Sequence, residues 1–146
     1  MTRARRLEPV RAIAQDAERA VAIRLASAEQ RYREAQQREQ DLRRYRQEYQ
    51  DNYAVRAGAG LQARQLREYQ SFLARLSVAI DAQKATLLQA QREVEQERQQ
   101  LRAAMARRKA LGSVIDKAQR EEQVMDEKRI QREIDERALR RTRGQP

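Results

Sequence analysis

Residues 66–129 decide the fold, and they read LREYQSFLARLSVAIDAQKATLLQAQREVEQERQQLRAAMARRKALGSVIDKAQREEQVMDEKR. Apolar side chains recur along this stretch in alternating steps of four and three residues, and fourteen of the nineteen positions so spaced are apolar. A mean spacing of about 3.5 residues gathers these positions into one narrow stripe along a helix. Such a stripe needs a second helix to cover it, so the chain is built to pack helix against helix.

A second stripe with the same spacing runs through residues 7–53, and twelve of its fourteen positions are apolar. These positions are Leu7, Val10, Ala14, Ala17, Val21, Leu25, Ala28, Tyr32, Ala35, Glu39, Leu42, Arg46, Tyr49 and Tyr53. Two four-residue steps follow each other from Ala17 through Val21 to Leu25. This irregularity predicts a stutter, which is a place where a supercoil locally unwinds.

Between the two stripes lies the segment Ala57-Gly58-Ala59-Gly60. Glycine ends helices readily because it tolerates left-handed backbone angles. We therefore predict an all-α fold, a two-helix antiparallel coiled-coil hairpin with a longer second helix. The alternative is two straight helices that meet a second copy of the chain.

The predicted hairpin is a single coiled-coil domain that covers residues 1–146. We expect helix 1 over about 7–57, a turn at 58–60 and helix 2 over about 61–141. In the register that follows, Leu42 lies level with Leu76, and Leu7 lies level with Leu111. The segment from about residue 115 then has no partner helix. Because isolated helices hold poorly in water, we expect residues 115–146 to fray or to be helical mainly when bound.

Composition argues against an enzyme. Cysteine and histidine are both absent, which removes a thiol nucleophile and the commonest general base and metal ligand. The chain also lacks a phosphate-binding glycine loop and any metal-ligand spacing. We therefore expect no catalytic activity, no cofactor and no metal. No apolar run is long enough to predict a transmembrane helix.

The net charge is +10, which favours binding to acidic partners such as nucleic acid, anionic lipid or an acidic protein face. Acidic residues are interspersed through most of the chain, so unopposed basic runs occur only at the two ends. These runs contain Arg3, Arg5, Arg6, Arg137, Arg140, Arg141 and Arg143. A structural interpretation remains open, in which they are solvated helix ends with cations near a helix C-terminus.

Five of the six aromatic residues lie between residues 45 and 72, so folding at the glycines brings them together. They are Tyr45, Tyr49, Tyr53, Tyr69 and Phe72. Tyr45 and Phe72 fall beside the stripes, where a two-helix seam gives little cover, and Ala79 lies on the same flank. Exposed aromatics with apolar neighbours are typical of protein-binding hot spots. The alternative is that the rings only widen the packed seam near the turn.

Several segments resemble the FliJ family. They are Arg6-Leu7-Glu8-Pro9-Val10, the pair Tyr45 and Tyr49, the segment from Gln70 to Gln83 that contains Phe72-Leu73 and Leu76, and the charged tail from Arg107 to Arg137. The similarity covers essentially the whole chain. It implies a noncatalytic coiled coil of the bacterial flagellar type III export apparatus, cytoplasmic and peripheral to the inner membrane at the flagellar base.

The resemblance also implies partners and a binding surface. Family members bind and promote the export ATPase ring (FliI), contact the export gate membrane protein (FlhA) and handle export chaperones. The family's exposed patch maps here onto Leu42, Tyr45, Tyr49, Phe72, Leu76, Ala79 and Gln83. Arg38 stands on the same face where the family usually has an uncharged polar residue. The basic ends would then meet acidic surfaces of the ring.

Two other functions are compatible with the composition. One is a basic helical arm that binds nucleic acid, although its arginines alternate with acids and no aromatic platform accompanies the basic ends. The other is a purely structural coiled-coil tether.

Overall fold

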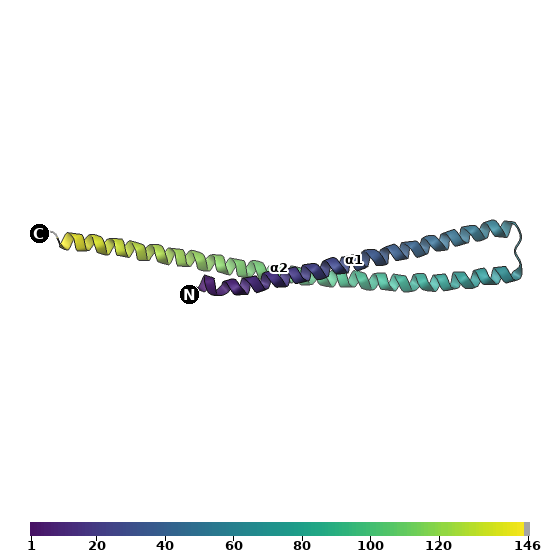
Figure 1. The fold of residues 1–146 in the computed structure, drawn as a ribbon, viewed down its shortest axis with the longest axis horizontal. Helices are drawn as coiled ribbons and strands as arrows, with labels where there is room; N and C mark the ends of the chain where they lie inside the picture. The colour runs from purple at the N-terminus through teal and green to yellow at the C-terminus, as the bar shows by residue number, and fades with distance from the viewer. Residues whose placement is uncertain (145–146) are drawn as a thin grey trace. The chain divides into compact units, whose positions relative to one another are not determined.

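The computed structural model describes residues 1–144, and it consists of two long α-helices joined by a short turn (Figure 1). Helix α1 spans Arg3–Gly58 and helix α2 spans Ala63–Arg143. The fold is the predicted antiparallel hairpin, in which a single chain supplies both helices. The chain forms two compact units: Val21–Leu101 contains the turn, while Met1–Ala20 belongs with the part of α2 from Arg102 onward. Whether the two units behave as one domain stays a prediction.

Local hydrogen bonds explain where the helices begin and end. Thr2 caps α1, since its Oγ1 accepts a hydrogen bond from the amide of Arg5 at 3.3 Å. At the turn, Gly60 has a φ of 95°, a backbone angle that favours glycine. The amide of Gln62 then donates to Oε1 of Gln65 at 3.1 Å, which is the reciprocal half of a capping box at the start of α2. The turn therefore occupies residues 59–62, against the predicted 58–60.

In the unit Val21–Leu101, the two stripes read from the sequence form the inner faces of the helices. The buried side chains here are Val21, Ala28, Ala35, Glu39, Leu76, Ile80, Ala90 and Val94. Most are small, and Ile80 is the only large side chain of this unit that is fully buried among the described residues. Glu39 occupies a seam position and forms an ion pair with Arg43 one turn along α1. The pairing lets a carboxylate stay in the seam.

In the other unit, the seam of α1 differs from the prediction. Ala4 and Ala14 are buried, but Val10 is 44% exposed and Ala17 is also exposed. Glu18 is half-buried in place of Ala17. Its carboxylate forms an ion pair with the guanidinium of Arg108 on α2. The predicted stutter is therefore wrong, because Glu18 continues the regular three-four spacing from Ala14. At this level the carboxylate of Glu18 reaches Arg108, whereas the methyl group of Ala17 would bury little apolar surface.

The covered part of α2 also extends further than predicted. Ile115 is fully buried and Ala118 is 3% exposed, and the amide of Ala4 donates to Oε1 of Glu122 at 3.1 Å. The expected register, with Leu7 level with Leu111, is therefore displaced by at least one helical turn. The overhang begins after Glu122 instead of near residue 115.

Beyond Glu122, every described residue is exposed, and the helix continues to Arg143. Gln145 and Pro146, which the overhang prediction included, lie outside the described residues. Within residues 1–144, neither helix is long and apolar enough to cross a membrane.

Candidate functional site

Five aromatic rings gather beside the turn in the unit Val21–Leu101. Tyr53 stacks on Tyr69 with the ring centroids 3.5 Å apart, and Tyr49 also stacks on Tyr69, at 5.3 Å. Phe72 contacts Tyr49 at 4.4 Å and meets Tyr45 edge to face at 6.0 Å. Offset and edge-to-face ring pairs each contribute about 0.5–1.5 kcal/mol beyond the area they bury. The cluster therefore stabilises the turn end of the hairpin.

The rings differ in exposure, and this separates packing from binding. Tyr49, Tyr53, Tyr69 and Phe72 are partly buried, whereas Tyr45 is 50% exposed. The guanidinium of Arg75 lies 6.0 Å from the centre of the Phe72 ring. Both sequence interpretations thus apply in part: most rings widen the seam, and Tyr45 offers an aromatic surface to solvent.

The spacing of the seam places the predicted binding residues on one flank of the hairpin. Tyr45, Phe72 and Ala79 each come immediately before a seam position. In an antiparallel pair such positions on the two helices face each other on the same side, and the contact between Tyr45 and Phe72 shows this directly. Ala79 is exposed about two turns further along α2, on the same side of the helix as Phe72. We call the flank formed by Tyr45, Phe72 and Ala79 the aromatic face.

The other predicted binding residues lie nearer the seam. Leu42, Tyr49 and Gln83 are half-buried at the edge of the aromatic face, and the side-chain amide of Gln83 donates to the carbonyl oxygen of Ala35 at 3.0 Å. Leu76 is only 7% exposed. It therefore offers less surface to a partner than Tyr45 does, and its role as a contact residue stays a prediction.

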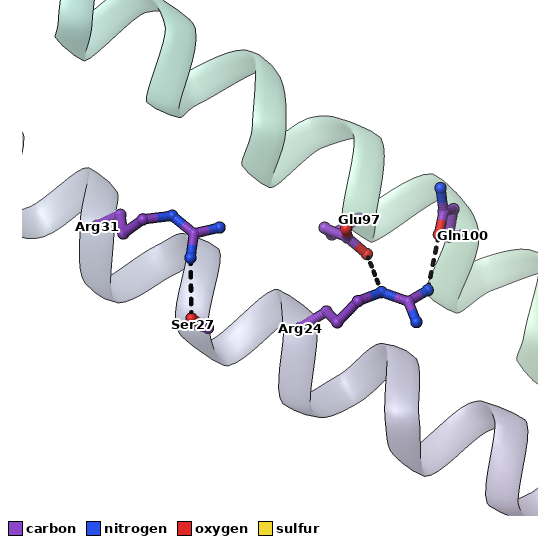
Figure 2. Close-up of polar contacts among 5 residues, drawn as sticks. All are labelled: Arg24, Ser27, Arg31, Glu97 and Gln100. Atoms are coloured by element: carbon purple, nitrogen blue, oxygen red, sulfur yellow. Dashed lines mark hydrogen bonds and ion pairs between the residues drawn. The ribbon is translucent and has the colours of Figure 1, made fainter.

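Polar residues continue the same flank away from the turn. Figure 2 shows Arg24, which donates to the Glu97 carboxylate at 3.3 Å and to the Gln100 side chain at 2.9 Å. In the same view Arg31 donates to the hydroxyl of Ser27 at 3.0 Å. Surface ion pairs of this kind contribute less than about 1 kcal/mol each. They favour the observed register more than they add stability.

A shallow open groove of about 590 Å³ lies between this polar stretch and the aromatic face. It is lined by Arg31, Glu34, Ala35, Arg38, Ala85, Thr86, Gln89, Ala90 and Glu93. Arg38, one of its lining residues, is exposed. Within residues 1–144, no group of three or more acidic residues is placed to hold a metal ion.

The arginines of the basic ends are exposed, and their positions relative to the helix dipoles differ. Arg137, Arg140 and Arg141 lie in the last turns of α2, where cations favour the negative end of the helix dipole. Arg3, Arg5 and Arg6 instead lie in the first turn of α1, which contains no acidic residue. Cations at the positive end of a helix are unfavourable. The interpretation of the basic runs as solvated helix ends with cations near a helix C-terminus therefore accounts for the C-terminal arginines only.

The stacked tyrosines predict a pH effect. Burial raises the pKa of Tyr69 above its usual value, and repulsion from the neighbouring Tyr53 and Tyr49 phenols raises this pKa further. The phenol of the unfolded chain therefore ionises first. Its contribution to stability is complete below about pH 10 and is lost as the pH rises through the folded pKa. We expect an alkaline titration followed by tyrosinate absorbance to show one late step.

Replacing Tyr69 by Phe is the control for this titration, because it should remove the late step and leave the others. A late step that persists in Tyr69→Phe would contradict the assignment.

The chain matches the model of a known protein family. The model of a family described as flagellar FliJ protein matches residues 3–146, which is nearly the whole chain. This match confirms the resemblance seen in the sequence. The chain matches no curated protein and no solved structure.

Proposed function

We propose that this chain, which belongs to the FliJ family and is a component of the flagellar protein export apparatus, acts there as a noncatalytic stalk. In this proposal its basic ends bind the export ATPase ring and promote its activity, and its aromatic face contacts the export gate. The exposed ring of Tyr45, held against Phe72 on one flank of the hairpin, is the observation that carries the proposal.

The aromatic face suits a protein partner. Tyr45 combines an apolar ring with a hydroxyl group, and it is presented by a helix whose backbone is held by ring contacts. Aromatic anchors on rigid elements lose little conformational entropy on binding. Contact with the gate protein FlhA would therefore centre on Tyr45 and Ala79, with Leu42, Tyr49 and Gln83 at the edge.

The basic ends suit an acidic surface on the ATPase, FliI. Arg3, Arg5 and Arg6 lie where the helix dipole disfavours cations, so an acidic partner would relieve a local repulsion. Arg137, Arg140 and Arg141 extend the positive charge on the exposed end of α2. Charges of this kind mainly speed encounter and select partners.

The same proposal covers the remaining roles. The chain would handle export chaperones and would work in the cytoplasm, peripheral to the inner membrane at the base of the flagellum. It would stimulate ATP hydrolysis by the ring and hydrolyse none itself. The shallow and open grooves among the described residues support a role in binding more than one in catalysis.

Co-purification with the ATPase and with the soluble domain of the gate protein tests the proposal. We expect the double variant Tyr45→Ala/Phe72→Ala to lose gate binding, to keep helicity near that of the wild type and to retain ATPase binding. Val55→Ala/Val78→Ala is the matched control, because these side chains are 77% and 68% exposed and lie outside the aromatic face.

Two results would contradict the proposal. If the aromatic double variant binds the gate as the wild type does, the aromatic face is not the contact. If it unfolds, the two rings belong to the core, and the assignment of the face fails.

A further inference from the structure

The overhang of α2, residues 123–144, exposes apolar side chains that the hairpin does not cover. Ile130 is 52% exposed and Ile134 is 53% exposed, and four residues separate them on one helix face. Glu127 lies one turn before this pair and Arg137 lies one turn after it. The four residues repeat the three-four spacing of a coiled-coil seam, so the overhang carries a short seam of its own.

This seam is not a continuation of the hairpin seam. The hairpin spacing, extended past Glu122, leads to Met125, Arg129 and Arg132, two of which are charged. Ile130 lies about 100° around the helix from Arg129. The isoleucine pair therefore points away from the line that α1 covers, and it needs a different partner.

The seams of two antiparallel copies of the overhang are complementary to each other. In an antiparallel pair of overhangs, Glu127 of one copy lies opposite Arg137 of the other, and Ile130 lies opposite Ile134. The twofold symmetry repeats both contacts, so two isoleucine layers lie between two layers of opposite charge. Arg137 is exposed, so its charge is accessible to a second copy.

We propose that the overhang pairs with the overhang of a second copy in this antiparallel arrangement. Flanking positions fit the same alignment. Val124 would face Ala138, and Asp126, which pairs with Arg129 in its own chain at 3.4 Å, would face Arg140 of the second copy. One contact opposes it, because Glu133 meets its own copy across the twofold axis. Pairing would also give the overhang helix the tertiary cover that an isolated helix lacks.

The pairing is weak and reversible. Only two half-exposed isoleucines per chain enter the seam, which is far less apolar surface than a permanent dimer buries. A net charge of +10 on each copy adds long-range repulsion. The opposite-charge layers thus decide the alignment, and the dimer forms at high protein concentration.

This inference goes beyond the proposed function and does not depend on it. Arg137 and Arg140 belong to the basic end that we assign to the ATPase ring, so a paired overhang would withhold them from the ring. A self-paired chain and a ring-bound chain would then exclude each other.

Charge reversal tests the pairing by sedimentation of the full chain over a range of concentrations. We expect Glu127→Arg and Arg137→Glu, each alone, to weaken the dimer at least about tenfold, since each creates two like-charge layers. An equimolar mixture of the two variants should form a heterodimer, because every layer again pairs opposite charges. The double variant should dimerise as the wild type does.

Arg132→Glu is the matched control. It reverses a charge of the same overhang on the face opposite the isoleucine pair, so it should leave the dimer unchanged. A wild type that stays monomeric at high concentration would overturn the proposal, as would a mixture of single variants that fails to associate. ATPase binding by the double variant is a separate readout: if it is lost while the dimer is kept, the ring contact needs Arg137 and the pairing still stands.

Discussion

Replacing Ile80 by Asp is expected to unfold the unit Val21–Leu101. Ile80 is 1% exposed, and it is the only fully buried large side chain of this unit among the described residues. The substitution removes its packing and places an unpaired carboxylate in the seam, a change that costs at least about 4 kcal/mol. This is comparable with the whole stability of a small domain, about 5–15 kcal/mol. Helical circular dichroism and chemical denaturation measure the loss.

Val78→Asp is the matched control for this experiment. Val78 lies two residues earlier on α2, and its side chain is 68% exposed. A surface substitution of this kind should change stability by no more than about 0.5 kcal/mol. If Ile80→Asp keeps wild-type helicity, or if both variants unfold alike, the seam does not lie where the structure places it.

Replacing Ile115 by Asp is expected to release the first helical turns of α1 from α2. Ile115 is fully buried in the unit formed by Met1–Ala20 and the part of α2 from Arg102 onward. The same cost of several kcal/mol applies here. Amide hydrogen exchange should show that protection is lost over residues 3–20 and over residues 102–122 of α2.

Amide hydrogen exchange of the wild type is the reference for the Ile115→Asp variant. Protection along α2 should continue past Ile115 and fall after Glu122, where the described residues become exposed throughout. Val124→Asp is the control, since Val124 is 49% exposed in the overhang and should leave residues 3–20 protected. A fall in protection already at residue 115 in the wild type would support the shorter overlap predicted from the sequence.

The apolar spacing predicted the hairpin because it is a property of each helix alone. Periodic apolar residues identify an inner face, and the glycines at the bend identify a turn. Those two signals sufficed for the unit Val21–Leu101, where the stripes carry most of the buried residues. They also placed Tyr45 and Phe72 beside the seam.

The seam near the N-terminus required information from both helices. When the seam is assigned from apolar residues alone, Ala17 is chosen instead of Glu18. Arg108 then counts as an interruption of the apolar stripe of α2. The two charged residues form an ion pair across the seam, so each makes the other's position acceptable. A search for opposite charges at matched seam positions would have found Glu18, and with it the longer overlap of the helices.

Leu76 illustrates the limit of the site prediction. The resemblance to a family pattern predicted that it belongs to a binding patch, but it is only 7% exposed in the structure. A pattern of residue types cannot separate a side chain that contacts a partner from one that supports it. Tyr45, at 50% exposure, keeps an aromatic surface that a partner can reach.

The small side chains of the seam also determine how this protein responds to heat and denaturant. Alanine accounts for Ala4, Ala14, Ala28, Ala35, Ala90 and Ala118 among the buried residues. Unfolding therefore hydrates less new hydrocarbon per residue than in a globular domain. The heat capacity of unfolding should be small for a chain of this length, and the dependence on urea should be shallow, so that the curve of stability against temperature is only weakly bent.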